Sequence, residues 1–244
     1  MKTLILCEGK TDAIFLSYYL GRVCGWIYIP NKDAPKDFSI TATEVMGESV
    51  EWYRKGDDFL LICAVGGKDN FSGFIKDKII PAMIDSSVFS QIVVVTDRDD
   101  REELSICQSF QAILSEIVSN IENNTWIENT YQNSYKQESF VKFLLLVIPS
   151  DKEGALETIL IDAISELEYD RPIVEKAKTY IDDIEPLALG YIGKRRLKLK
   201  AWLGVIWATQ YPEKILTSID KQIRSVKWED SETLSQCFSE LRKI

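Results

Sequence analysis

Short apolar runs alternate along the chain with segments in which apolar residues recur at helical spacing. Four runs predict buried strands, because each is apolar and is bounded by glycine, proline or charged residues. They are Thr3–Cys7, Phe59–Val65, Gln91–Thr96 and Phe140–Ile148. We expect all four in one sheet, the first three parallel, with Gln91–Thr96 as a central strand flanked by the other two.

Helical periodicity separates these strands. The predicted helices cover about Ala13–Val23, Phe71–Ile84, Glu102–Glu122 and Glu153–Ser165, and the chain after them is expected to be helical, with breaks at Pro172, Pro186, Gly190 and Pro212. Residues 24–40 and 123–138 are expected to be irregular or polar surface segments. Glu51–Lys55 is expected to form a hairpin with the second strand around Gly56.

This alternation predicts an α/β fold: a Rossmann-like, mostly parallel sheet with helices on both faces. We expect residues 1–168 to form this α/β domain. Residues 169–244 are expected to form a helical C-terminal extension packed on it.

The composition fits a globular protein, since 45% of the 244 residues are apolar and 11% are aromatic. No apolar run approaches the ~18 residues that a membrane helix needs. The residues after Met1 do not resemble a secretory signal. We therefore expect a soluble, cytoplasmic protein that does not act in a membrane.

The residue types that are missing narrow the chemistry. Histidine is absent, which excludes Ser-His-Asp catalysis and histidine metal sites. The five cysteines are scattered without a CxxC pair, which fits a reducing compartment and argues against a zinc site. A hard cation held by carboxylates is still compatible with the sequence.

The net charge of −9 excludes a protein that coats nucleic acid without specificity, because such proteins are basic. A local basic patch can still act within an acidic protein. One dense cluster is present, made of Lys194, Arg195, Arg196, Lys198 and Lys200.

Notable residues follow each predicted strand, and open parallel sheets form their sites at the carboxyl ends of strands. The four strand ends carry Glu8-Gly9, then Gly66-Gly67-Lys68, then Asp97-Arg98-Asp99, and then Glu153 to Glu157 beyond Pro149. If the strands are neighbours, these ends meet at one crevice.

Asp97 and Asp99 are the candidate metal ligands. Residues i and i+2 of an extended segment point the same way, so both carboxylates are expected to approach one cation. Two like charges would resist ionising together, and a divalent ion removes that penalty. Glu8 would add a third carboxylate or act as the acid/base group, and Asp12 lies four residues further along the chain.

Each of these features also has an ordinary structural interpretation. Asp-x-Asp after a strand is common as a turn or helix cap, and Gly66-Gly67 is most simply a tight turn. The basic cluster is most often a solvated helix face, and Asp12 and Glu157 are compatible with exposed helix positions. The functional prediction therefore depends on their joint occurrence in this order.

That order resembles the Toprim domain of topoisomerases, bacterial primases, small ribonucleases and the overcoming-lysogenization-defect (OLD) nucleases. The resemblance covers about residues 3–165, through LCEGKTD, VGGKDN, VVVTDRDD and PSDKEGALETIL, with a weaker match at KLKAWL near residues 194–203. The sequences of these motifs are most similar to those of small stand-alone Toprim-like proteins related to the OLD branch.

The resemblance implies a role for each matching residue. It implies that Glu8 is the general acid/base, that Asp97 and Asp99 bind Mg²⁺, that Glu157 is a further acidic residue of the metal site, and that Lys198 is a late catalytic lysine. We add Asp12 as a metal-site candidate and Gly66, Gly67 and Lys68 as phosphate-binding candidates, and we expect Mn²⁺ to substitute for Mg²⁺. Arg98 departs from the family pattern, in which a small residue is commoner, and the chain lacks the modules that give most Toprim proteins their task.

Three functions are compatible with these observations. The first is Mg²⁺-dependent phosphodiester chemistry on nucleic acid, which makes the protein a candidate nuclease. The second is a non-catalytic or partner-dependent module that binds nucleic acid or nucleotides and works with an ATPase or helicase-type protein. The third is a nucleotide-sugar transferase, which also places Asp-x-Asp on Mg²⁺ but explains neither Glu8-Gly9 nor Gly66-Gly67 as well.

Overall fold

The computed structural model describes residues 1–40, 42–43, 47–214 and 219–244. Contacts within the chain divide it into two compact units. The first unit consists of Met1–Thr96, Arg101–Val147 and Glu240–Ile244, and the second of Asp97–Asp100 and Ile148–Ser239. The division falls at other points than the boundary expected at residue 168, because the helix that follows the last strand groups with the C-terminal helices.

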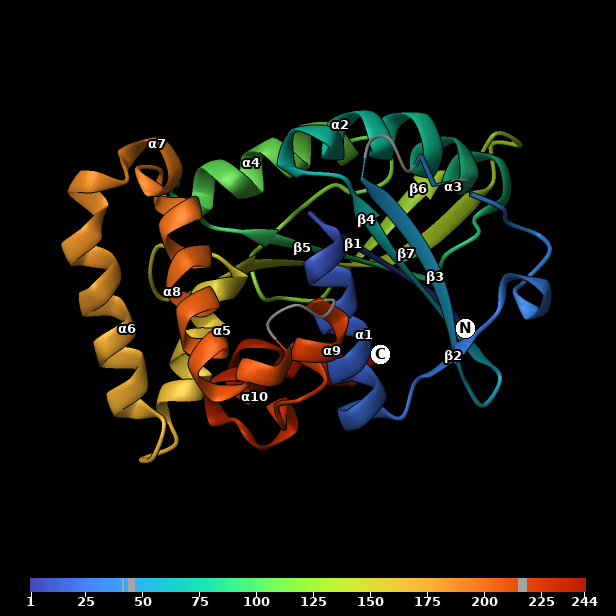
Figure 1. The fold of residues 1–244 in the computed structure, drawn as a ribbon. Helices are drawn as coiled ribbons and strands as arrows, with labels where there is room; N and C mark the ends of the chain where they lie inside the picture. The colour runs from blue at the N-terminus through green and yellow to red at the C-terminus, as the bar shows by residue number, and fades with distance from the viewer. Residues whose placement is uncertain (41, 44–46, 215–218) are drawn as a thin grey trace. The chain divides into compact units, whose positions relative to one another are not determined.

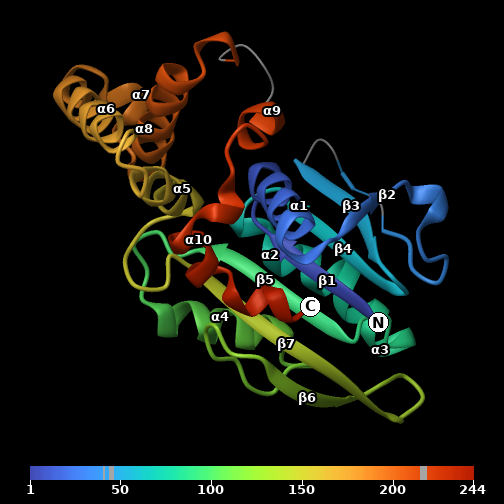
Figure 2. The ribbon, with the colours of Figure 1, turned by 90° about the horizontal axis from the view of Figure 1, so that it is seen from below.

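Within the described residues a seven-stranded sheet forms, in the order β2-β3-β4-β1-β5-β7-β6. Figure 2 shows β1, β5, β7 and β6 side by side in this order. The strands are β1 (Lys2–Cys7), β2 (Ile27–Ile29), β3 (Glu48–Lys55), β4 (Asp58–Val65), β5 (Gln91–Asp97), β6 (Ile127–Gln132) and β7 (Glu138–Ile148). All four strands predicted from apolar runs therefore lie in one sheet.

The centre of the sheet is parallel and its edges are antiparallel. β1 pairs in parallel with both β4 and β5. β7 runs in the same direction as β5, because the Lys142 amide donates to the Ser90 carbonyl at one end and the Arg98 amide donates to the Ile148 carbonyl at the other. β2, β3 and β4 pair antiparallel, as do β6 and β7.

The expected neighbours of Gln91–Thr96 were wrong in one respect. Gln91–Thr96, in β5, was expected between Thr3–Cys7 (β1) and Phe59–Val65 (β4). It lies instead between β1 and β7, and β1 lies between β4 and β5. The side chains of Leu4 to Cys7 in β1 are fully buried. Continuous apolar runs suit any inner position of a parallel sheet, so the sequence pattern does not specify which strands are neighbours.

Helices cover both faces of the sheet in the first unit, as expected (Figure 1). α1 (Lys10–Cys24) packs on one face. The other face carries α2 (Phe71–Phe74), a π-helical turn (Ile75–Ile79), α3 (Ile80–Ser86) and α4 (Glu103–Leu114). Alternate residues of each strand supply the two faces, so that Leu4 and Leu6 join the cluster beneath α2, α3 and α4.

Three local expectations were wrong. The helix predicted over Glu102–Glu122 ends at Leu114, and the segments expected to be irregular contain the edge strands β2 and β6. β6 alternates between exposed and buried positions over only six residues. Its buried Asn129 accepts from the amide and the hydroxyl of Ser119, each at 2.9 Å. Edge strands this short depend on the neighbouring strand rather than on their own apolar content.

The second unit is helical after the last strand, as predicted. Its helices are α5 (Leu156–Ser165), α6 (Arg171–Ile184), α7 (Leu189–Ile192), α8 (Arg195–Gln210), α9 (Ile219–Ile223) and α10 (Glu232–Cys237). α6 and α8 lie side by side, and α5 contacts both (Figure 1). No helix in the described part of the chain is long and apolar enough to cross a membrane.

In the second unit, the Glu166 side chain accepts hydrogen bonds from the first residues of α10. Its carboxylate accepts hydrogen bonds from the Thr233 amide at 2.6 Å, the Glu232 amide at 3.0 Å and the Ser231 hydroxyl at 3.1 Å. Burial acts to raise the pKa of Glu166, but these hydrogen bonds outweigh it and hold the pKa below its ordinary value.

We expect Glu166→Gln to lower the free energy of unfolding by about 1 kcal/mol at neutral pH, the usual effect of a lost helix cap. Because the folded pKa is lowered, this contribution is present above the unfolded pKa of about 4.3 and is lost as the pH falls through the folded value. Urea unfolding at several pH values measures it. A difference between wild type and variant that is the same at pH 3 and pH 7 would contradict this explanation.

Candidate functional site

Three strand ends of the first unit meet at Glu8. Glu8 directly follows β1, and its carboxylate oxygen Oε1 accepts from the Thr96 hydroxyl at the end of β5, at 2.8 Å. The Glu8 carbonyl accepts from the amide of Gly67, which follows β4, at 2.7 Å. The ends of β4, β1 and β5 therefore converge, as the parallel arrangement predicts.

The Gly66-Gly67 segment is a tight turn. Gly66 has φ +81° and Gly67 has φ +123°, backbone conformations that residues with a side chain rarely adopt. The Asn70 side chain closes the turn by donating to the Gly66 carbonyl at 2.9 Å. The half-buried Lys68 begins the 3-10 turn that follows. This geometry accounts for the glycines, and phosphate binding by Gly66, Gly67 and Lys68 stays a prediction.

Asp12 has a structural task at the start of α1. Its Oδ2 atom accepts from the Gly9 amide at 2.8 Å, one of the amides left without a partner at a helix N-terminus. An aspartate in the first turn also interacts favourably with the helix dipole. Its proposed role as a metal ligand stays a prediction.

In the second unit, Asp97 and Asp99 are tied to the segment that precedes α5. Asp97 ends β5, and its Oδ1 atom accepts from the Leu156 amide at 2.9 Å, at the first residue of α5. Asp99 and Gly154 exchange backbone hydrogen bonds of 2.7 and 2.9 Å. The carboxylate of Asp97 thus caps α5, one of the ordinary interpretations of an Asp-x-Asp segment.

The chain is not extended through Asp99, so strand alternation does not define the direction of the Asp99 side chain relative to that of Asp97, and a shared cation stays a prediction. Asp99 has φ +55°, in the left-handed region. The bridge to Gly154 accompanies this turn, and aspartate tolerates the left-handed conformation better than most residues. Gly154 itself has φ +151°, and a Cβ atom there would lie 2.4 Å from Oγ1 of Thr158.

Glu157 and Lys198 each have ion-pair partners in the second unit, and their expected roles at the metal site and in catalysis stay predictions. Glu157 is buried rather than exposed, and it pairs with Lys200. The ammonium of Lys198 contacts Asp182 at 2.9 Å and Glu185 at 2.6 Å. Hydrogen bonds to Glu185 and then Asp182 raise the pKa of Lys198 above its ordinary value. The lysine that reaches Glu157 is therefore Lys200, a residue of the basic cluster for which no separate role was predicted.

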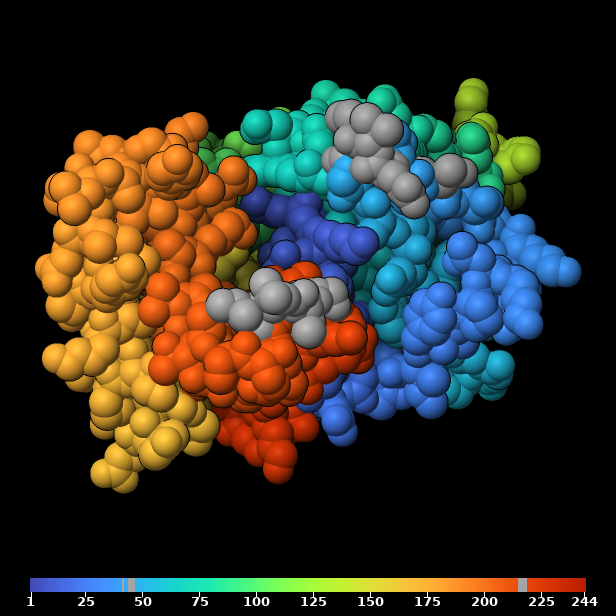
Figure 3. All heavy atoms as spheres, viewed as in Figure 1, coloured from blue at the N-terminus to red at the C-terminus, as the bar shows by residue number. Residues whose placement is uncertain are grey.

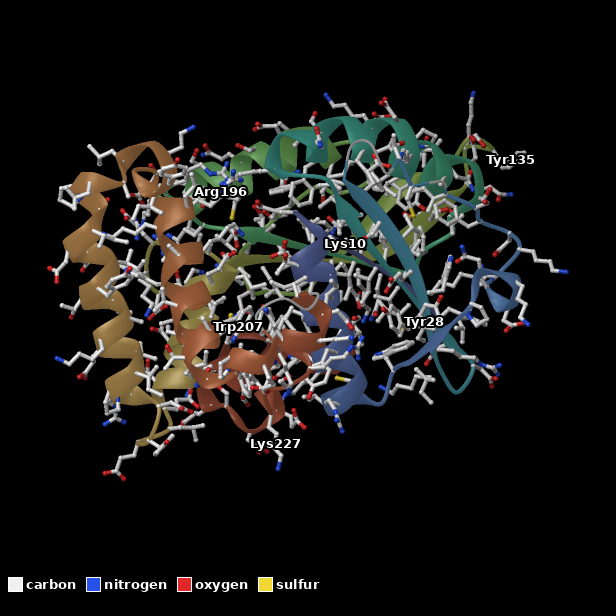
Figure 4. All side chains as sticks on the ribbon, viewed as in Figure 1. Lys10, Tyr28, Tyr135, Arg196, Trp207 and Lys227 are labelled. Atoms are coloured by element: carbon white, nitrogen blue, oxygen red, sulfur yellow. The ribbon has the colours of Figure 1, made fainter. Side chains whose placement is uncertain are left out.

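A hollow of about 340 Å³ in the second unit joins acidic and basic residues that are far apart in the sequence. Arg196, near the start of α8, is labelled in Figure 4. The hollow is lined by Asp99, Asp100, Gly154, Lys194, Arg195, Arg196 and Leu199. Asp100 and Gly154 were not among the predicted site residues, although both lie in the segments that follow predicted strands.

A model of the family described as "Protein of unknown function (DUF3226)" matches residues 2–242. The chain belongs to this family. A search of curated proteins found no match. A crystal structure of a hypothetical protein from Pyrococcus horikoshii OT3 is similar, with a TM-score of 0.54 and 18% sequence identity over 98% of this chain and 94% of that chain. This likeness shows the shared fold, and none of the comparisons names a Toprim protein, so the Toprim resemblance stays a prediction.

The metal site expected for this DUF3226 chain would be made of carboxylates, since the sequence has no histidine. In the residues that the structure describes, no group of three or more histidine, cysteine, aspartate or glutamate side chains is gathered so that it could hold a metal ion. Mg²⁺, however, is usually bound by one or two carboxylates together with water and substrate phosphate. Asp97 and Asp99 supply the oxygen donors that this mode of binding uses, and two carboxylates alone do not make a closed structural site.

We expect the Lys200–Glu157 pair to stabilise this DUF3226 chain more than the pairs of Lys198 do. Lys200→Met leaves the buried Glu157 carboxylate without its counter-ion, and should cost about 1–3 kcal/mol, less than for a fully buried pair because Lys200 is half exposed. Lys198→Met, the matched control, loses contacts to more exposed carboxylates and should cost about 0–1 kcal/mol.

Chemical unfolding of the two variants measures the difference. Adding Glu157→Gln to Lys200→Met should restore most of the loss, because it removes the uncompensated charge. Equal losses for Lys200→Met and Lys198→Met would contradict the unequal roles of the two lysines.

Proposed function

We propose that this DUF3226 chain carries out Mg²⁺-dependent phosphodiester chemistry on nucleic acid, with a Toprim-like site formed by Glu8, Asp97 and Asp99. The observation that carries the proposal is the Glu8 carboxylate at the end of β1, hydrogen-bonded to Thr96 at the end of the parallel strand β5. Asp97 is the next residue along the chain. A nuclease with Mg²⁺ or Mn²⁺ as cofactor is the activity that this arrangement supports best.

Each residue of the proposed site would have a definite role in the reaction. Glu8 would move the proton of the attacking water or leaving group, since the chain has no histidine for that role. The Thr96 hydroxyl orients the Glu8 carboxylate by donating to Oε1. Asp97 and Asp99 would hold the metal, which when bound supplies charge stabilisation at the phosphoryl oxygens.

The remaining candidates would act at the edges of this site. The Toprim resemblance implies that Lys198 stabilises charge in the transition state. The ion pairs of Lys198 with Asp182 and Glu185 support a structural role instead. Glu157 would add negative charge to the metal site only if Lys200 moved away from it. Gly66, Gly67 and Lys68 would bind the phosphate backbone through amides and an ammonium group.

A second candidate is a non-catalytic or partner-dependent binding module, which a specific observation favours. Asp12 and Asp97 each cap a helix and Glu157 is paired with Lys200, so these acids already have structural tasks. A protein partner, such as an ATPase or helicase-type protein, would then be needed to complete or activate the site.

A cleavage assay separates the two candidates. Plasmid DNA, single-stranded DNA and RNA are incubated with wild type in Mg²⁺, Mn²⁺ or EDTA, and Glu8→Gln is assayed in parallel. Cleavage that needs both the metal and Glu8 supports the nuclease. A wild-type protein that cleaves none of these substrates would shift the assignment to the partner-dependent module.

A further inference from the structure

Exposed aromatic and basic side chains lie together where α7 meets α8. Tyr191 in α7 is 82% exposed, and Leu189 in the same helix is 63% exposed. Lys194, Arg195 and Arg196 follow at the start of α8 and are all exposed. In Figure 3 the orange residues, which include this segment, form part of the visible face. We call Tyr191, Lys194 and Arg196 the α7–α8 surface.

The two cations of this surface share the hollow with the carboxylates of Asp99 and Asp100. In the part of the chain that the structure describes, neither Lys194 nor Arg196 forms an ion pair with a carboxylate, whereas Arg195 pairs with Glu153. Both residues line the hollow of about 340 Å³ described above. This volume is near the lower end of the range for small-molecule pockets, about 300–1,000 Å³. It suits one phosphate and its sugar better than a folded partner.

Tyr191 does not line the hollow, but it lies three residues before Lys194 in the chain. Three peptide units separate Tyr191 from Lys194, so their Cα atoms are at most about 11 Å apart. The segments on either side of this connection are ordered, because the Gly193 amide donates to the Leu189 carbonyl at 3.1 Å and the Lys198 amide donates to the Lys194 carbonyl at 3.0 Å. A ring and two cations so close along the chain can engage a base and the adjoining phosphates of one strand.

We infer that the α7–α8 surface binds single-stranded nucleic acid, with a base stacked on Tyr191 and the neighbouring phosphates at Lys194 and Arg196. That this strand is the substrate rests on the proposed function. An unpaired base has a free face for the tyrosine ring, whereas the bases of a duplex already stack on one another. With a net charge of −9, the protein as a whole repels a long duplex backbone, so binding depends on a local cluster of cations. An acidic peptide would satisfy the cations and leave the ring without a partner.

The test is equilibrium binding by fluorescence anisotropy, with a labelled single-stranded 12-mer and a duplex of the same sequence in EDTA. We expect the single strand to bind at least tenfold more tightly than the duplex. Tyr191→Ala should weaken single-strand binding by about tenfold or more, the usual effect of losing one stacked base. Tyr191→Phe, which keeps the ring, should bind like wild type.

Matched control variants show whether an effect on binding is specific to this surface or would follow from the loss of any exposed tyrosine or lysine. Tyr169 is 87% exposed and precedes α6, whereas α7 follows the other end of α6. The 14 residues of α6 span about 21 Å and separate Tyr169 from the α7–α8 surface. Tyr169→Ala should therefore leave binding unchanged. The double variant Lys194→Gln with Arg196→Gln should reduce the slope of log affinity against log salt by about 0.7 per phosphate released. Lys176→Gln with Lys227→Gln, at exposed lysines elsewhere in the second unit, should not reduce it.

Four outcomes would overturn the inference: no single-strand binding by wild type, equal or tighter duplex binding, equal effects of Tyr191→Ala and Tyr169→Ala, or displacement of the strand by polyglutamate as readily as by unlabelled oligonucleotide. The last would indicate a general polyanion surface. Because binding is measured without metal, it is independent of cleavage. Cleavage without this binding defeats the inference alone, and binding without cleavage defeats the proposed function alone.

Discussion

Glu8→Gln is expected to lower metal-dependent cleavage of nucleic acid by about 100-fold or more, the usual contribution of a general acid/base. Glutamine keeps a side-chain oxygen that can accept from the Thr96 hydroxyl, so the local geometry should be preserved while the titratable group is removed. Stability should therefore change little. Initial rates on plasmid and single-stranded substrates, at saturating Mn²⁺ and Mg²⁺, measure the effect.

Two control variants sharpen this experiment. Glu138→Gln changes an exposed glutamate at the start of β7 and should cleave like wild type. Lys198→Ala should reduce cleavage if the role implied by the Toprim resemblance holds, and should leave it unchanged if the ion pairs with Asp182 and Glu185 are its whole task. Cleavage by Glu8→Gln at the wild-type rate would rule out Glu8 as the acid/base group.

The second large effect is expected from Asp97→Asn combined with Asp99→Asn, which should abolish Mn²⁺ binding measured by calorimetry. Asparagine is the better replacement than alanine at both positions. At Asp97 its oxygen can still accept from the Leu156 amide, and at Asp99 it tolerates the left-handed backbone. The double variant thus removes two charges and keeps the cap and the turn.

Stability gives an independent check on this variant. If Asp97 and Asp99 share one cation, their carboxylates repel one another without metal, so the amides should leave the free energy of unfolding unchanged or raise it, as at many functional sites. A loss of several kcal/mol would instead show a structural role. Asp57→Asn with Asp85→Asn, at two exposed positions, is the matched control and should retain Mn²⁺ binding. Mn²⁺ binding by the Asp97/Asp99 variant at wild-type affinity would place the metal elsewhere.

Local sequence pattern determined the elements of the fold. The runs Thr3–Cys7 and Gln91–Thr96 became strands because burial on both faces of a sheet requires apolar residues at every position. Helical spacing predicted α1 and the helical second unit for a similar reason, since one face of each helix must be buried. The position of Glu8 at a strand end also followed from local pattern, because the apolar run before it stops there.

Only the tertiary structure decided how the candidate residues are used. Lys198 and Lys200 are two residues apart on α8, so they point to different sides of the helix. The packing of α5 and α6 on α8 brings Glu157 to Lys200. It brings Asp182 and Glu185 to Lys198. Strand alternation predicted a common direction for Asp97 and Asp99, but the chain turns at Asp99, where it forms a long-range bridge to Gly154. Periodicity reports which face of an element is buried, whereas the partner on that face depends on contacts between segments distant in sequence.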